Sequence, residues 1–367
     1  MRQREGSPHG AASVQLTSSR ISVDDLAEAQ EACHSRGWTD GLPIVPPTDD
    51  AVAACLDWAM LAPDHLIGIE PVRARAITAE KAAVNAVMAG CLPPHFPVVV
   101  TALTALLLPE FGLHGPTAST GGCAVLLIVN GPIRHDLAMD ATFSVLGGAD
   151  RSRAVIARAV RLVLANVLDV KPGGIDRSTL GHPGKLGYCI AEDEEATGWV
   201  SLGDQRLSTA PAEQGHVSSV TAVASMAPRQ VMNEWTTDPA ELCETLAAEI
   251  RANQLNYSIW PGNYVVILPP QMRTHFDAAG WSKADIAGCV YERARVRRGD
   301  WAAVGKRAVV KDRAERTYPA LESPEDLLIV AAGGPAGGFA AVIPPWLGTR
   351  SHAATVAVGA CVDCEIS

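Results

Sequence analysis

KPGGIDRSTLGHPGKLGYCIAEDEE, residues 171–195, is the stretch around which the rest of the chain is organised. It holds a glycine pair, a His-Pro-Gly-Lys turn, a short apolar run and four consecutive acids. The apolar run 186–191 has the length of a short strand. A helix is expected just before this stretch and strand-like segments follow it, so we expect it to be a site-bearing connection within an α/β fold.

Apolar periodicity on both sides of this stretch predicts alternating helices and strands. Residues 151–168 place apolar side chains on one helical face, and 239–253 and 282–295 also read as helices. Residues 123–129, 217–226, 264–268 and 326–331 read as strands. We therefore predict a mixed α/β fold in which two helix-and-strand halves pack together. The expected division is a disordered tail (1–20), an N-terminal half (21–200) and a C-terminal half (216–367), with the polar segment 198–215 near the boundary.

Composition restricts the classes of partner. The 367 residues carry a formal charge of −10, which argues against nucleic acid or an anionic membrane as the main partner. No apolar run reaches the roughly 20 residues of a spanning helix, and the first residues lack the apolar core of a secretory signal. We therefore expect a cytoplasmic protein, without a membrane partner, that acts on a small molecule and forms an oligomer.

Four residues are candidates for catalysis. His182, Cys189 and Glu192 bring an imidazole, a thiol and a carboxylate within eleven positions, types that serve either a Cys–His nucleophile pair or a metal site. Cys91 is a further candidate thiol, but it follows a predicted helix end, where the helix dipole does not favour a thiolate. The nine cysteines are expected to be reduced. The pair Cys361 and Cys364 has redox or metal spacing but no second pair to complete a zinc site.

A second group of residues is expected to hold the substrate. Lys81 and Asn85 share one face of a predicted helix, which is either a solvated stripe or a pocket wall. Polar side chains near the ends of the predicted strand 123–129 are candidates because ligands gather at the carboxyl ends of strands in α/β sheets. Arg151 begins a helix after two glycines, and Lys185 occupies a turn suited to fixing an anion. The full set of candidates is Lys81, Asn85, His114, Thr117, Thr120, Asn130, Arg151 and Lys185.

Common signatures of known chemistry are missing. The sequence contains neither GxGxxG nor GxxxxGK[ST], and no GxSxG, HExxH or EF-hand loop. Nucleotide binding is therefore not implied, and the sequence identifies neither a cofactor nor a particular metal.

Several blocks together resemble a known family. They are GWTDGLPIVPPT (37–48), EKAAVNAVMAGCLPPHFPVV (80–99), LHGPTASTGG (113–122), VNGPIR (129–134), RSTLGHPGKLGYCIAEDEE (177–195), GWSKADI (280–286) and the glycine turn 333–338. This combination is similar to a poorly characterised bacterial family related to, or associated with, the UGSC-motif (seleno)protein domain. The resemblance implies thiol or selenol redox chemistry. Because the chain has no Cys-Gly-Ser-Cys, it implies that this motif resides on a small separate redox partner.

Three functions follow as hypotheses. The first is a subunit of an enzyme, a thiol-linked oxidoreductase or one that forms C–S bonds, acting on a small anionic substrate in specialised metabolism with that partner. The second is a metal-dependent lyase or hydrolase that uses His182, Cys189 and Glu192. The third is a non-catalytic scaffold subunit. We also expect one pocket in which residues 171–195 form a wall facing 81–91, 114–122 and Asn130.

Overall fold

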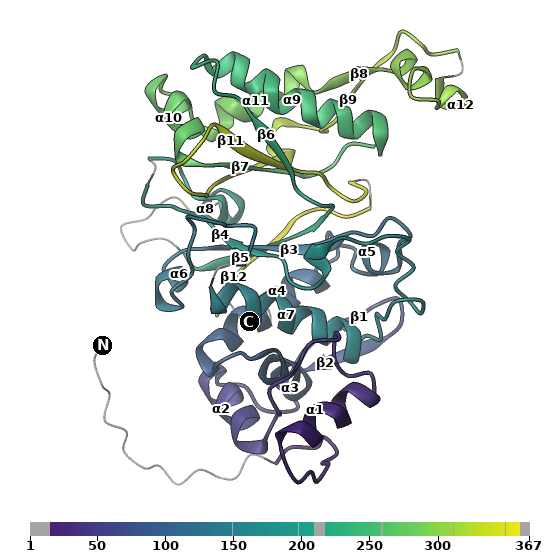
Figure 1. Cartoon of the computed structure of the whole chain (residues 1–367), viewed down its shortest axis with the longest axis vertical. Coiled ribbons are helices and arrows are strands. Elements are labelled where there is room, and N and C mark those ends of the chain that lie inside the picture. The colour runs from purple at the N-terminus through teal and green to yellow at the C-terminus, as the bar shows by residue number, and fades with distance from the viewer. Residues whose placement is uncertain are drawn as a thin grey trace, which may run out of the picture.

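The computed structural model describes residues 15–148, 150–196, 198–208, 217–257, 260–310, 312–348 and 350–359. Its core is two four-stranded sheets that lie face to face, each covered on its outer side by helices (Figure 1). The α/β fold predicted from the sequence is confirmed. The Cys361–Cys364 motif lies outside the described residues.

The first sheet has the strand order β12-β5-β3-β4. Strand β3 pairs in parallel with β4 and antiparallel with β5, and β5 pairs antiparallel with β12. Helices α4 and α7 cover its outer face, and α3 packs against α7, with α1, α2 and a two-stranded hairpin also on this side (Figure 1). The bounds are α1 Leu26–Ser35, α2 Asp49–Ala59, β1 Leu66–Glu70, β2 Arg75–Thr78, α3 Ala79–Ala89, α4 Phe96–Leu107, β3 Ala124–Asn130, α7 Arg151–Asn166, β4 Cys189–Ala191, β5 Ser219–Ser225 and β12 Ala354–Ala357.

The second sheet has the order β10-β7-β11-β6 and is covered by α9, α10 and α11 (Figure 1). A small sheet, β8-β9, and α12 extend from one corner of this half. The bounds are β6 Arg229–Met232, α9 Pro239–Asn256, β7 Tyr264–Leu268, α10 Pro270–Ala278, α11 Lys283–Arg293, β8 Arg295–Arg297, α12 Arg307–Val310, β9 Thr317–Pro319, β10 Leu327–Ala331 and β11 Phe339–Ile343. Short helices are α5 His114–Ala118, α6 Ile133–Asp136 and α8 Leu202–Leu207, with single 3₁₀ turns at Pro93–His95, Pro183–Lys185, Arg298–Ala302 and Pro324–Asp326.

Strands β3, β5, β7 and β10 are buried on both faces. On β3, Leu127 and Val129 pack toward the helices, while Leu126 and Ile128 pack against the second sheet. On β7, Val265 and Ile267 belong to the same layer between the sheets. Because successive strand residues point to opposite faces, a strand buried on both sides needs an unbroken apolar run. This explains why these strands could be predicted from the sequence.

The two sheets do not follow the order of the chain. Strands β5 and β12 both come after residue 216, yet they pair with β3 in the first sheet. The division at 198–215 stays a prediction about domains, and the strand pairing crosses it. In the tail expected to be disordered, residues 1–14 are outside the described part. Farther along, the backbone N–H groups of Thr17 and Ser18 donate hydrogen bonds to Glu80 on α3.

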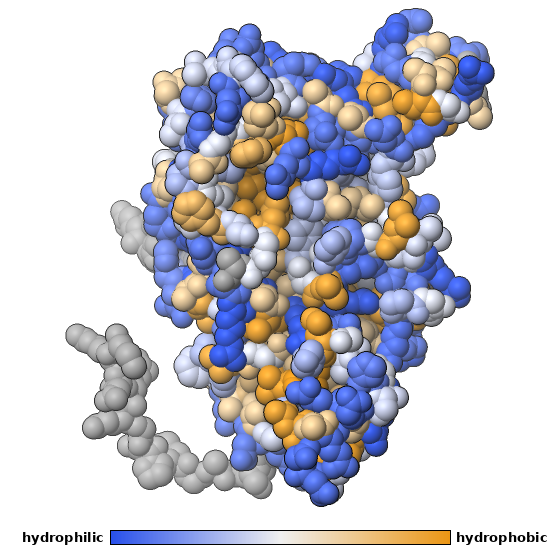
Figure 2. Space-filling view, in the orientation of Figure 1, coloured by the Kyte–Doolittle hydropathy of each residue, from blue (hydrophilic) through white to orange (hydrophobic). Residues whose placement is uncertain are grey.

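The surface and the helices bear on possible membrane contact and on oligomer formation. Figure 2 shows hydrophobic side chains in the recess between the two halves and over part of the N-terminal half, with hydrophilic side chains over most of the remaining face. In the described residues, no helix is both long and apolar enough to cross a membrane. Oligomer formation stays a prediction.

Candidate functional site

Residues 171–195 follow α7 and include β4 of the first sheet, and they contribute to two separate polar clusters. The first cluster surrounds a small cavity on the helix side of this sheet. The second lies where β3 and β4 end. We call them the cavity cluster, formed by Arg161, Asp176 and Lys185, and the carboxylate cluster, formed by Asn130, Glu192 and Lys283.

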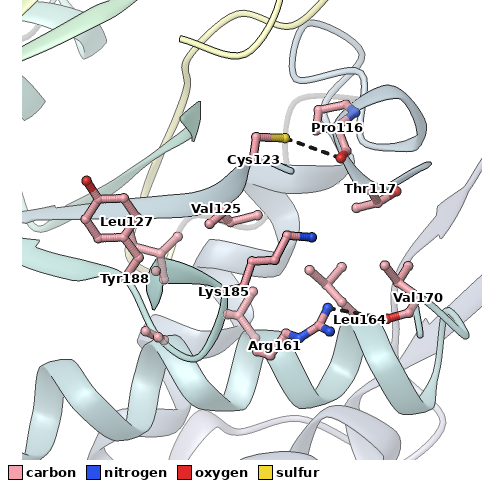
Figure 3. Close-up of a pocket in the computed structure, with 15 residues that line it drawn as sticks. Pro116, Thr117, Cys123, Val125, Leu127, Arg161, Leu164, Val170, Lys185 and Tyr188 are labelled. Atoms are coloured by element: carbon pink, nitrogen blue, oxygen red, sulfur yellow. Dashed lines mark hydrogen bonds between the residues drawn. The ribbon is translucent and has the colours of Figure 1, made fainter. Parts of the chain in front are cut away.

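The cavity has a volume of about 40 Å³ and lies between α5, α7, β3 and the segment 184–188 that leads into β4. At roughly 10–15 Å³ for each water, it has room for a few small molecules of that size. In Figure 3 the Lys185 side chain extends into the space between Cys123 and Arg161. The lining is Pro116, Thr117, Cys123, Ala124, Val125, Leu127, Ala157, Val160, Arg161, Leu164, Val170, Gly184, Lys185, Gly187 and Tyr188.

Two cations share one buried carboxylate beside this cavity. Lys185 Nζ donates to Asp176 Oδ2 at 2.7 Å, whereas Arg161 Nη2 is 4.0 Å from the same oxygen. Ser178 donates to the other oxygen of Asp176 through its N–H and its hydroxyl. Arg161 donates a single hydrogen bond within the described residues, to Val170 O at 3.3 Å. Most of the five N–H donors of this guanidinium are therefore left for another acceptor.

The pKa shifts of Asp176 and Arg161 are consistent with this arrangement of charges. Burial alone would raise the pKa of Asp176, but hydrogen bonds from Lys185 and Ser178 outweigh it and hold that pKa below its usual range. Burial lowers the pKa of Arg161, and the nearby carboxylates of Asp176 and Asp40 offset this only in part. An arginine stays protonated under such a shift because its ordinary pKa is far above neutrality. The cluster therefore holds two positive charges and one negative charge.

Cys123 is a cavity residue that the sequence-based reasoning did not select. It directly precedes β3, and its Sγ lies 3.3 Å from Pro116 O. Burial raises the pKa of its thiol to about 12, although the charge of Lys185 acts in the opposite direction. The thiol is thus protonated at neutral pH. The available signal was its position, directly after a Gly-Gly turn and at the start of a buried strand.

The carboxylate cluster is built around Glu192, which is 2% exposed. Its Oε2 accepts from Asn130 Nδ2 and from the backbone N–H of Leu202, both at 2.7 Å. Its Oε1 accepts from Lys283 Nζ at 2.5 Å and from the backbone N–H of Ala331 at 3.3 Å. Lys283 begins α11 and Ala331 ends β10. This carboxylate therefore joins the first sheet, at the end of β4, to the second sheet and its helices.

Two of the neighbouring acids, Glu194 and Glu195, are also paired. Arg134, which is buried on α6, donates to the backbone oxygen of Glu192 and forms ion pairs with Glu194 and Glu195. Glu195 also contacts His135 at 2.7 Å. The hydrogen bond from Arg134 is the main reason that the pKa of Glu195 is lowered to about 2. The four-acid run is therefore mostly a structural anchor for the loop that follows β4.

The described contacts of His182 involve neither the thiol nor the carboxylate with which it was grouped. Its Nε2 is 3.3 Å from Ser225 O, its Nδ1 accepts from Gly184 N–H, and its ring meets Tyr188 edge-on. Burial lowers the pKa of His182. The described contacts therefore present a neutral imidazole held by backbone groups.

Cys91 and Cys189 are both buried in the core between the first sheet and its helices. The Sγ of Cys91 lies 3.5 Å from Val155 O. Burial raises the thiol pKa of both residues, that of Cys189 to about 12. Neither thiol lines the cavity. Their catalytic role stays a prediction, and the burial of both sulfur atoms gives it no support.

The candidate binding residues divide between several places. Lys81 Nζ donates to Ser18, and Asn85 accepts from Asn166 on α7, so both serve contacts of α3. Arg151 donates to Gly90 O.

The remaining candidates lie around α5. The Thr117 hydroxyl bonds within α5 while the residue lines the cavity, and His114 Nδ1 is buried with no partner in the described structure. Thr120 is exposed, and its backbone oxygen accepts from Thr179.

The structure thus brings the candidates together in two pairs, Lys185 with Thr117 and Asn130 with Glu192. The expected wall containing Lys81 and Cys91 is not part of the cavity lining. Across the described ranges, no group of three or more His, Cys, Asp or Glu side chains is arranged to hold a metal ion. In particular, Glu192 is fully engaged by four donors.

No protein-family model, curated protein or solved structure matches this chain.

Proposed function

We propose that this protein is the substrate-binding subunit of a thiol-linked enzyme, and that it holds a small anionic substrate at the cavity cluster. The redox thiol or selenol belongs to a small partner protein, as the UGSC resemblance implies. The observation that carries this proposal is the incomplete pairing of Arg161 beside a cavity that Lys185 also enters.

A small oxyanion would complete this arrangement of charges. Two cations face one carboxylate, so one further negative charge brings the cluster to neutrality. Guanidinium groups bind carboxylate and phosphate oxygens through two parallel N–H donors, and charge-assisted hydrogen bonds are the stronger kind. The Arg161 and Lys185 side chains remain 17% and 20% exposed, which leaves them accessible to a ligand.

The thiols of this chain support the assignment of redox chemistry to the partner. Burial holds the pKa of Cys91, Cys123 and Cys189 above its ordinary value. The thiolate, not the thiol, is the nucleophile in exchange and C–S bond formation. A partner that carries an accessible, acidic thiol or selenol supplies what these buried groups do not.

Anion titration by calorimetry at constant ionic strength tests the proposal. Acetate, nitrate, sulfate and phosphate are titrated into the whole chain and into Arg161→Gln and Lys185→Met variants. We expect saturable binding of at least one anion, weakened at least tenfold by either substitution. Tenfold corresponds to roughly 1.4 kcal/mol of binding free energy.

Arg158→Gln is the matched control. Arg158 lies one turn earlier on α7, is paired with Asp40 through two hydrogen bonds and does not line the cavity. This variant should keep the affinity of the parent protein. Absence of saturable binding, or an equal loss in Arg158→Gln, would contradict the proposal and favour the scaffold hypothesis. Turnover with the partner in Cys91→Ser, Cys189→Ser and His182→Ala variants separately tests those predicted catalytic roles.

A further inference from the structure

A second concave site lies in the C-terminal half, between the end of β6, the start of α10 and the glycine turn before β11. Its volume is about 330 Å³, within the roughly 300–1,000 Å³ of small-molecule sites. The lining is Asn233, Glu234, Trp235, Thr236, Thr237, Gln271, Met272, His275 and Gly338. We call it the Trp235 groove. It shares no lining residue with the cavity beside Lys185.

The groove combines an exposed indole with a carboxylate. Trp235 is 80% exposed, so most of its aromatic surface faces solvent. Glu234 Oε1 accepts a hydrogen bond from Gly338 N–H at 3.0 Å. Its Oε2 makes no hydrogen bond within the described part of the chain. Neither lysine nor arginine occurs among the described lining residues. The electrostatic character of the groove is therefore negative, apart from any charge on His275.

The backbone that presents these two side chains is fixed by short contacts. Asn233 N–H donates to Gly338 O at 2.8 Å, and Asn233 Oδ1 accepts from Trp235 N–H at 3.1 Å. The Asn233 side chain is itself anchored to Thr245 on α9. A Cβ on Gly338 would lie 2.4 Å from Asn233 O, so only glycine allows this approach. The glycine turn noted in the sequence thus holds the backbone of Glu234 and Trp235 in place before a ligand arrives.

We propose that the Trp235 groove binds an organic ammonium group. The face of an indole ring attracts cations more strongly than other aromatic side chains do, and aromatic recognition of quaternary ammonium groups is a known use of this interaction. The Glu234 carboxylate adds a direct charge partner, and the net charge of −10 favours the approach of a cation. This inference is independent of the function proposed for the cavity cluster.

Paired ligands isolate the charge. Choline and 3,3-dimethylbutan-1-ol have nearly the same shape, but only choline is charged. Ligand-observed NMR and calorimetry at pH 8 and low salt should show saturable binding of choline and at least tenfold weaker binding of the neutral analogue. Raising the ionic strength should weaken choline binding, because salt screens exposed charges.

Variants locate the site. Trp235→Leu should weaken choline binding at least tenfold, and Glu234→Gln should weaken it several-fold. Trp58→Leu, which removes a 59% exposed tryptophan from α2 in the other half, should leave binding unchanged. Unfolding midpoints confirm that each variant is folded.

Equal binding of the neutral analogue, unchanged binding in Trp235→Leu, or no saturable binding of choline, tetramethylammonium or guanidinium would overturn the proposal. Competition by uncharged glucose with the same dependence on Trp235 would also overturn it, and would assign the groove to sugars.

Discussion

The carboxylate cluster and the cavity cluster both contain a buried acid from residues 171–195, but they differ in how completely their charges are paired. Glu192 receives four donors from four different elements or loops, including Lys283 from the opposite half. Within the described residues, the Arg161 guanidinium donates one hydrogen bond and lies 4.0 Å from the nearest carboxylate oxygen. The first arrangement leaves little for a ligand to add, whereas the second leaves donors directed at a cavity.

This difference in charge pairing indicates that one cluster contributes to stability and the other to ligand binding. A buried charge that loses its partner is strongly destabilising, so a fully paired cluster such as that of Glu192 ties the two halves together. A cluster with spare donors at a partly open cavity tolerates change at a smaller cost in stability and supports recognition. Substitutions in the carboxylate cluster should therefore mainly lower stability, whereas substitutions in the cavity cluster should mainly change anion binding.

The largest effect is expected from Glu192→Gln. It leaves Lys283 buried without its counter-charge, and we expect a loss of about 3–5 kcal/mol in the free energy of unfolding. Urea denaturation measures this loss. The double variant with Lys283→Met should lose less than the sum of the single variants, because it removes both charges.

Glu244→Gln is the control for this prediction. Glu244 pairs with Arg251 while its side chain remains 51% exposed, so its loss should cost less than about 1 kcal/mol. A similar cost for Glu192→Gln would mean that the buried pair does not tie the two halves together.

An intermediate effect is expected from Asp176→Asn, which removes the shared acid of the cavity cluster. The hydrogen bonds it accepts predict a loss of about 1–3 kcal/mol at pH 7. Its pKa is lower in the folded state than in the unfolded chain. The stabilisation is therefore present above the ordinary aspartate pKa of about 3.9 and is lost as the pH falls through the lower folded value.

Unfolding of the parent and Asp176→Asn proteins across this pH range measures the difference. The same variant should bind acetate more tightly, since Asp176 competes with a ligand for Lys185 and Arg161. A stability difference that grows as the pH falls, or weaker acetate binding, would contradict this assignment.

The smallest effect is expected from Tyr188→Phe. The Tyr188 hydroxyl is buried and has no hydrogen-bond partner within the described residues. Removing an unpaired buried polar group is nearly neutral or stabilising, so the free energy of unfolding should stay unchanged or rise by up to about 1 kcal/mol. Anion binding should not change. A clear loss of stability in urea would reveal a partner for this hydroxyl.

Local patterns made much of the fold predictable. The helix expected at 151–168 is α7, and the strand expected at 264–268 is β7 with the same bounds. These elements follow from apolar periodicity and from runs buried on both faces. The pairing of β5 and β12 with β3 was not predictable in the same way, because strand order depends on contacts distant in sequence.

The candidate site was predictable only in part, for the same reason. Lys185 was selected from its turn, and Asn130 from its place after a strand. Arg161 looked like one of several arginines on the solvated face of a helix, and nothing local distinguished it. Lys283 and Glu192 are 91 residues apart in the sequence. Their ion pair could not be predicted because it depends on how the two sheets pack together.

A crystal structure of the protein with selenate tests the central claim most directly, because the anomalous signal of selenium locates the anion without assumption. Our account predicts one ordered peak at the cavity, with oxygen atoms within hydrogen-bond distance of Arg161 and Lys185, and none at Glu192. No peak between Arg161 and Lys185 at saturating selenate, or a peak at the carboxylate cluster instead, would contradict it.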